Sequence, residues 1–279
     1  MKSTRKNVLS NSQRVRRLTE IAIMLALSTV LSFVKLYQLP YGGAFTLASM
    51  FPLIIIAYRH GTAAGFFAGL IYGVIQQLFS LSYIQGMTLF SAVMVIILDY
   101  GLAFAVIGFA GLFRKSKNGQ VFGLVTGALL GCFLRYACHT IAGCTVWAGV
   151  SIPEAAAFIY SLLYNAAYMI PETLITVAAA YYVGSCIDFN KEMPQRVASG
   201  KGNIPVSPLD ITGGLCLFAA AVTDIIIVFS HTQNENGEFD ITLIKDISSG
   251  DIITIGAVTA AAVIVFAVFK IVSSRKTKE

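Results

Sequence analysis

The sequence predicts an all-α fold, that of a polytopic helical membrane protein. Hydrophobic residues make up 56% of its 279 residues and charged residues only 12%, with a mean hydropathy of +0.75. A soluble domain carries roughly 25% charged residues, so this chain has too few of them to cover a surface in contact with water. The apolar residues form long blocks rather than the alternating pattern of a membrane β-barrel.

Hydropathy predicts eight membrane spans, because a helix of ~20 residues crosses the hydrocarbon layer. The second span is short, and we expect it to be tilted or only partly embedded. The eight predicted spans are residues 17–36, 46–59, 62–80, 88–113, 119–148, 155–184, 209–231 and 251–273.

The Lys and Arg residues lie almost entirely on one side of this arrangement. They precede the first span, occupy the second and fourth connections, follow the sixth span and close the chain, with only Lys35, Arg135 and Lys245 elsewhere. The positive-inside rule places that side in the cytoplasm. We therefore predict a multi-pass cell membrane protein whose N-terminus and C-terminus are both cytoplasmic. The same asymmetry accounts for the net charge of +6 without nucleic-acid binding.

A shift in composition divides the chain into four parts. A polar, proline-containing linker separates a block of six helices from a last pair. The parts are a basic cytoplasmic N-terminal segment (1–16), a six-helix membrane domain (17–185), a cytoplasmic linker (186–208) and a C-terminal two-helix membrane extension (209–279).

Glycines recur at every fourth position in two of the predicted helices. Small residues at this spacing form a smooth stripe along which another helix can approach closely. We expect both stripes to serve packing within the molecule. They are Gly61, Gly65, Gly69 and Gly73 in one helix, and Gly119, Gly123, Gly127 and Gly131 in the other.

Three polar residues on three different helices are predicted to lie at one level of the membrane. At about 1.5 Å per residue, Asp99, His139 and Asn165 each fall ~14–16 Å below the outer ends of their helices. Ionisable groups at membrane depth are costly and mark candidate functional sites. The sequence therefore predicts a pocket in the outer half of the membrane. Arg135 and Glu172 are expected to form an internal ion pair, because buried charges need partners.

Aromatic residues are expected above and beside this level: Trp147, the only tryptophan, with Tyr83, Tyr100 and Tyr160. A carboxylate beneath aromatic walls suits a flat cationic heterocycle, because ring faces and negative charge both attract it. Two alternatives stay open. The aromatic residues could form an interfacial belt that faces lipid headgroups, and Asp99 could simply pair with Arg135 or His139 inside the bundle.

Several stretches carry a resemblance to a known family. The most specific is the run His139-x-x-x-Gly143-x-x-x-Trp147, followed by Tyr160-x-x-x-x-Asn165 at the start of the next helix. Further matching stretches are Arg17-Leu-Thr-Glu-Ile-Ala-Ile-Met-Leu-Ala26, Ala68-Gly-Leu-Ile-Tyr-Gly73 and Asp99-Tyr100. Together, over roughly residues 14–185, they resemble the thiamine-binding S component of energy-coupling factor (ECF) transporters. The resemblance implies a six-helix S-component-like bundle, to which this chain adds two C-terminal transmembrane helices.

The resemblance also implies roles for individual residues in substrate binding. Trp147 would stack on the pyrimidine ring of thiamine, with His139, Tyr160 and the backbone of Gly143 around it. Asp99 stands where the family has a glutamate facing the thiazolium, with Asn165 beside it. Tyr100 and Tyr83 would contact or close over the hydroxyethyl end. Tyr72 occupies a position where a tryptophan can occur, and Gly42-Gly43 stand where a lid tryptophan can sit.

Ala22 and Ala26 match the Ala-x-x-x-Ala motif with which the family docks on its transmembrane coupling subunit. The resemblance thus implies uptake driven by that subunit and two separate ATPase subunits. This chain has no G-x-x-x-x-G-K-[ST] motif with which to hydrolyse ATP itself.

We therefore expect the substrate-capture subunit of a vitamin uptake transporter, most simply one for thiamine, with residues 17–185 as its binding domain. One alternative is an S component for a thiamine precursor or another vitamin. A second is an intramembrane hydrolase, which the absence of HExxH and G-x-S-x-G motifs disfavours. A third is a scaffold or assembly protein, which would need neither the polar triad nor the aromatics. We predict no enzyme activity, no cofactor and no metal site, since the five cysteines form no CxxC and no metal-ligand spacing with histidine.

Overall fold

The computed structural model describes residues 10–150, 157–197, 208–234, 240, 243 and 246–276. Residues 1–9 of the predicted N-terminal segment, the start of the sixth span at 155–156, residues 198–207 of the linker and the last three residues lie outside these ranges, as does Lys245. The chain is mostly helical, as predicted. It also contains two small antiparallel sheets, β1 with β2 and β3 with β4, which an all-α fold does not include.

The elements follow one another in this order: α1 (Asn11–Phe33), β1 (Lys35–Gln38), η1 (Pro40–Gly42), β2 (Ala44–Thr46), α2 (Phe51–His60), α3 (Thr62–Phe79), η2 (Leu81–Ile84), α4 (Leu89–Val95), η3 (Ile96–Leu102), α5 (Ala103–Ala105), η4 (Val106–Phe113), α6 (Gln120–Thr145), α7 (Ala157–Cys186), β3 (Ile187–Asp188), β4 (Gln195–Arg196), α8 (Pro208–Ser230) and α9 (Ser249–Lys276).

Six helical segments in the described part of the chain are long and apolar enough to cross a membrane. They correspond to the predicted third to eighth spans: Thr62–Phe79, Leu89–Phe113, Gln120–Thr145, Ala157–Cys186, Thr212–Ser230 and Ser249–Ser273.

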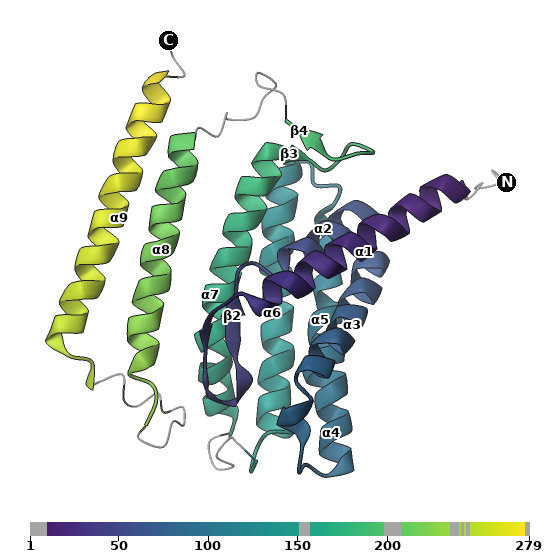
Figure 1. Cartoon of the computed structure of the whole chain (residues 1–279), viewed down its shortest axis with the longest axis vertical. Helices are drawn as coiled ribbons and strands as arrows, with labels where there is room; N and C mark the ends of the chain where they lie inside the picture. The colour runs from purple at the N-terminus through teal and green to yellow at the C-terminus, as the bar shows by residue number, and fades with distance from the viewer. Residues whose placement is uncertain are drawn as a thin grey trace.

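The first two predicted spans differ from expectation. Helix α1 begins at Asn11 because Ser10 caps it. The Ser10 hydroxyl accepts from the Gln13 backbone N–H, and the Gln13 side chain accepts from that of Ser10. The early start places three arginines on the helix, and α1 crosses the bundle obliquely (Figure 1). Helix α2 has only 10 residues, about 15 Å of helix, because the chain before it turns at Ala48, where φ is 58°.

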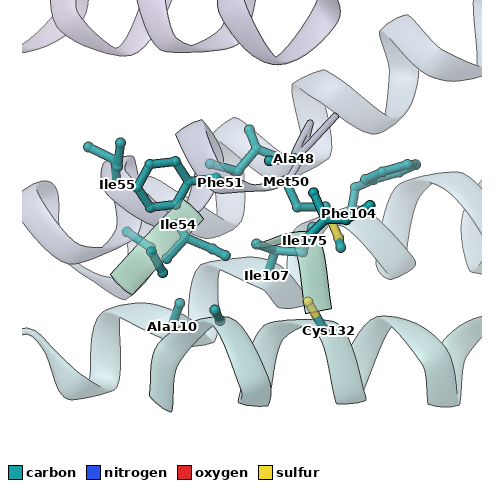
Figure 2. Close-up of a cluster of buried hydrophobic side chains, with 14 of the residues drawn as sticks. Ala48, Met50, Phe51, Ile54, Ile55, Phe104, Ile107, Ala110, Cys132 and Ile175 are labelled. Atoms are coloured by element: carbon teal, nitrogen blue, oxygen red, sulfur yellow. The ribbon is translucent and has the colours of Figure 1, made fainter. Parts of the chain in front are cut away.

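Helix α2 lies at the centre of the molecule rather than against lipid. Every residue from Phe51 to Tyr58 is buried. Its isoleucines pack against η4, α6 and α7 in the main apolar cluster, which includes Ile107, Cys132 and Ile175 (Figure 2). Burial on all sides explains why this segment is apolar throughout although it is too short to span a membrane.

The glycine stripes of α3 and α6 pack against the fourth span from two sides, which confirms the predicted internal role. A Cβ built on Gly69 would lie 2.2 Å from the carbonyl oxygen of Phe104, and one on Gly73 would lie 2.3 Å from that of Tyr100. On α6, a Cβ on Gly127 would meet Ala110 at 3.0 Å. Only glycine allows the backbones of α3 and the fourth span to approach this closely.

The fourth span is not a regular α-helix. Its middle, η3, is π-helical, and its end, η4, is a 3₁₀ helix. Short π-helical turns inside α-helices often mark functional sites, and Asp99 lies in this one. Helices α8 and α9 stand side by side next to α7 (Figure 1). Between them, the Thr259 hydroxyl donates to Asp224 Oδ2, giving this intramembrane carboxylate a partner that the sequence did not indicate.

Candidate functional site

The structure contains a cavity of about 170 Å³ between the β1–β2 hairpin and helices α3, η3, α6 and α7. All nine residues predicted to bind substrate line it. They are Tyr72, Tyr83, Asp99, Tyr100, His139, Gly143, Trp147, Tyr160 and Asn165. Asp99, His139 and Asn165, which helix rise predicts to lie at one level, thus line one cavity.

Asp99 is the centre of the polar network in this cavity. Its Oδ1 lies 2.5 Å from His139 Nδ1, and its Oδ2 accepts a hydrogen bond of 3.0 Å from the indole Nε1 of Trp147. Trp147 thus faces the pocket rather than forming part of a lipid-facing belt. The Asp99 side chain is 17% exposed, which leaves part of its carboxylate open to the cavity.

Arg135 determines which nitrogen of His139 carries the proton. Its Nε donates to His139 Nε2 over 3.0 Å, and a guanidinium can only donate. His139 Nε2 must therefore be the unprotonated nitrogen, and Nδ1–H donates to Asp99. The imidazole is neutral in this arrangement. Among the described residues no Lys or Arg forms an ion pair with Asp99, so its negative charge remains available to a cationic ligand.

The predicted ion pair between Arg135 and Glu172 does not form. The Arg135 guanidinium instead lies over the ring of Phe104, 4.4 Å from its centroid, and contacts Met50 Sδ at 3.0 Å. Glu172 accepts from the backbone N–H of Thr46 at 2.5 Å and from the hydroxyls of Thr46 and Ser49. The carboxylate is satisfied by donors of the hairpin and the following turn, so it needs no cation.

Asn165 reaches the cavity while being anchored within α7. Its Nδ2 donates to the Ser161 carbonyl at 2.8 Å, and its Oδ1 accepts from the Tyr168 hydroxyl at 2.6 Å. The rings of Tyr160 and Tyr164 stack with centroids 6.3 Å apart, and Tyr168 packs edge-on against both Tyr164 and His139. Helix α7 thus provides one aromatic wall of the cavity.

The β1–β2 hairpin covers the cavity. At its tip the backbone N–H of Gly43 donates to the hydroxyl of Tyr164 over 2.9 Å. Next to it, Gly42 has φ of +95°, and a Cβ there would lie 2.9 Å from the Tyr83 ring. The Gln38 side chain also donates to the Tyr83 hydroxyl, at 3.3 Å. These contacts join the hairpin to both α7 and the loop after α3.

Sequence reasoning did not assign several cavity residues to the binding site, namely Tyr41, Thr46, Ser49, Phe104, Tyr164, Tyr168 and Glu172. Tyr164 and Tyr168 could have been found, because they follow Tyr160 at helical spacing on the same face of α7. The hairpin residues gave no such signal, because their position depends on a turn rather than on a periodic pattern.

Ala22 and Ala26, predicted to dock a partner subunit, lie away from the cavity. Both are exposed on α1, beside the exposed side chains of Ile23 and Leu27. In the described part of the chain, no three His, Cys, Asp or Glu side chains lie together where they could hold a metal ion.

Fold and site together define a class. A multi-pass helical membrane protein with an aromatic-lined pocket around the Asp99 carboxylate is a membrane-embedded receptor for a small organic solute. Comparison with known proteins narrows this class. Residues 18–187 match the family model described as "Thiamine transporter protein (Thia_YuaJ)". The chain belongs to this thiamine transporter family, and it is therefore a transport protein rather than an enzyme.

Two curated relatives and one solved structure agree with this membership. The chain is 33% identical over 182 residues to the thiamine transporter ThiT of Bacillus subtilis (strain 168), a match that covers 60% of this chain and 89% of the relative. It is 27% identical over 173 residues to ThiT of Lacticaseibacillus paracasei, covering 57% and 81%. The structure of ThiT from Listeria monocytogenes superposes with a TM-score of 0.52 at 28% identity, covering 62% of this chain and 94% of that one. The family model ends at residue 187, so α8 and α9 lie beyond it.

Proposed function

We propose that this chain binds thiamine in the cavity beneath the β1–β2 hairpin, as the substrate-binding S component of an ECF transporter. The observation that carries the proposal is the Asp99 carboxylate. It is held by two neutral donors, Trp147 and His139, and faces a cavity lined by aromatic rings. Thiamine combines a cationic thiazolium with a flat aminopyrimidine, so it matches both the charge and the rings.

The proposed pose follows the resemblance to the family. The aminopyrimidine lies against Trp147, between His139 and Tyr160 and close to the backbone of Gly143. The thiazolium lies beside Asp99 and Asn165, where a cation gains most from the unneutralised carboxylate. Tyr100, Tyr83 and Tyr72 enclose the remainder of the ligand below the hairpin. All of these residues line the same cavity, which supports this pose.

We further propose that Ala22 and Ala26 dock on the transmembrane coupling subunit, which works with two ATPase subunits. A small-residue face allows a partner helix to approach closely. The exposure of both alanines on an oblique helix supports this assignment (Figure 1). In this arrangement the chain captures the ligand, and the partner complex supplies the energy for its release inward.

The same proposal includes the topology and the domain boundaries. The binding domain, 17–185, comprises six helical segments: α1, α2, α3, the fourth span, α6 and α7. Helices α8 and α9 form the separate extension at 209–279. Both chain ends are placed in the cytoplasm, by the distribution of Lys and Arg. This placement is supported by Figure 1, where the start of α1 and the end of α9 lie toward the same end of the molecule.

Binding of thiamine to the purified chain tests the proposed function. Trp147 is the only tryptophan and lines the cavity, so its fluorescence should change on binding. We expect saturable binding of thiamine. The neutral aminopyrimidine half alone should bind much more weakly, because it lacks the charge that Asp99 attracts. Equal binding of that neutral half would favour a precursor as the substrate, and absence of any thiamine binding by the folded protein would refute the proposal.

A further inference from the structure

The C-terminal extension makes a specific contact with the cover of the cavity. The Phe229 ring, near the end of α8, stacks on the Tyr37 ring of β1 with centroids 6.4 Å apart and an angle of 27° between the ring planes. The Gln233 side chain lies just beyond and donates to the Tyr37 hydroxyl at 3.4 Å. The hairpin is therefore held from outside the part of the chain that matches the family model.

Tyr37 transmits this contact into the hairpin. It is the direct cross-strand partner of Phe45 on β2, and the two rings stack with centroids 6.1 Å apart. Phe45 is completely buried. Three aromatic rings from α8, β1 and β2 thus stand in a row. Such pairs add stability beyond their buried area. The row joins the extension to the interior of the hairpin.

The far end of the same hairpin covers the cavity. Its tip residues Gly42 and Gly43 contact Tyr83 and Tyr164, and these contacts close the side of the cavity that lies under the hairpin. Tyr37 does not line the cavity, and neither do Phe229 and Gln233. Any effect of these three residues on ligand exchange must therefore act through the position of the hairpin.

We propose that the helix pair α8–α9 is a brace that holds the β1–β2 hairpin closed over the cavity through the contact of Phe229 and Gln233 with Tyr37. These are positioning residues that slow the exchange of ligand, and they touch no ligand themselves. The inference rests on the proposed binding of thiamine in this cavity. The proposal also gives the extension a role, which is to lengthen the time that the ligand stays bound at the outer surface.

The kinetics distinguish a brace from a residue that supports the pocket. A brace stabilises the closed hairpin with and without ligand, so removing it raises the population of the open state in both. Association and dissociation of thiamine should then accelerate together, leaving the dissociation constant nearly unchanged. Damage to the pocket would instead accelerate dissociation alone and weaken binding by the same factor.

The experiment measures thiamine association and dissociation rates on the full-length chain by Trp147 fluorescence. The variants are Phe229→Ala, Tyr37→Ala and the double variant. The matched control is Leu215→Ala, on the same helix but with a side chain 58% exposed. We expect each single variant to raise both rates by about 3- to 10-fold, the size of one aromatic contact. The double variant should add little to Tyr37→Ala, because that change already breaks the contact with Phe229. Phe229→Leu preserves packing volume if the alanine variant does not fold.

Two results would overturn the inference while the proposed function stands. One is normal thiamine binding with rates in Phe229→Ala that match those of Leu215→Ala. The other is faster dissociation with unchanged association. If the wild-type chain binds no thiamine, the proposed function fails. Amide hydrogen exchange over residues 35–46 then tests separately whether α8–α9 stabilise the hairpin. Faster exchange in Phe229→Ala than in the control supports the brace, and equal exchange refutes it.

Discussion

The Trp147 indole donates a hydrogen bond of 3.0 Å to Asp99, although Trp147 follows the last turn of α6 and Asp99 lies midway along the fourth span. The contact turns the only tryptophan of the chain inward and fixes one oxygen of the carboxylate. His139 fixes the other. Because both donors are neutral, they orient the carboxylate without removing its charge, which prepares the site for a cation.

Replacing Asp99 by Asn should abolish most of the affinity for thiamine. The change removes the negative charge. It also replaces one carboxylate oxygen by an amide N–H₂, so either His139 or Trp147 loses its acceptor. We expect thiamine to bind about 10- to 150-fold more weakly, the equivalent of one lost hydrogen bond to a charged group. Asp99→Glu keeps the charge and should cause a much smaller loss. Titration of both variants by calorimetry checks this, and equal affinities would show that the charge at this position does not recognise the ligand.

Replacing Gly73 by Ala should damage both the stability and the site. The added Cβ would lie 2.3 Å from the Tyr100 carbonyl, a backbone atom that no rotamer change can move away. We expect η3, which carries Asp99 and Tyr100, to shift at a cost of about 1–3 kcal/mol in the free energy of unfolding, with weaker thiamine binding.

Gly131→Ala on α6 is the matched control for this substitution. Its Cβ would meet Ile107 at 3.4 Å, which is ordinary contact. Its effect should stay within about 0.5 kcal/mol. Thermal unfolding in detergent compares the two variants. Equal stability would show that the close approach of α3 to the fourth span tolerates a methyl group.

The membrane class, the helices beyond residue 60 and the convergence of Asp99, His139 and Asn165 could all be predicted from the sequence. These features depend on regular geometry. Apolar blocks of sufficient length must form helices in lipid, and helix rise converts sequence position into depth. Nine residues of the cavity lining followed from that depth and from the resemblance to the family.

The remaining features depend on local irregularities that have no periodic signal. The fourth span packs between two glycine stripes, and no periodic pattern in its sequence marks the π-helical turn of η3. The hairpin depends on left-handed backbone at Tyr41 and Gly42. Glu172 was assigned to Arg135 because both are charged, yet it binds Thr46 and Ser49, whose proximity follows from that hairpin. The charge of a buried carboxylate alone does not predict its partner, because hydroxyls and backbone N–H groups can donate to it in place of a cation.

Replacing Glu172 by Leu should loosen the base of the hairpin. Glu172 is 1% exposed, and the substitution leaves the buried Thr46 N–H without its acceptor and removes the carboxylate from the Thr46 and Ser49 hydroxyls, which keep their bond to each other. We expect a loss of about 1–3 kcal/mol in the free energy of unfolding and faster amide exchange at Thr46. Glu172→Gln retains one acceptor oxygen and should lose less. Equal losses in the two variants would contradict a role for Glu172 as the acceptor at this position.

Arg59 joins α1, α2 and the β3–β4 loop, and its replacement by Lys should destabilise the molecule. The guanidinium pairs with both carboxylate oxygens of Glu20. It also donates to the backbone carbonyls of Phe189, Lys191 and Glu192, at 2.5, 3.0 and 3.1 Å. Its side chain is only 7% exposed. A lysine cannot reproduce this planar fork of donors. We expect a loss of about 1–3 kcal/mol in the free energy of unfolding.

Arg16→Lys provides the comparison for Arg59→Lys. Arg16 also pairs with a glutamate, Glu192, at 2.6 Å, but the two side chains are 37% and 77% exposed. Exposed pairs contribute little, so this variant should lose less than about 0.5 kcal/mol. Neither residue lines the cavity, so thiamine affinity should stay unchanged in both while Arg59→Lys alone lowers the melting temperature. A drop in affinity with Arg59→Lys would instead mean that the attachment of α1 through Arg59 is energetically coupled to the closure of the cavity. The coupling would run through α2, which leads from Arg59 to the base of the hairpin.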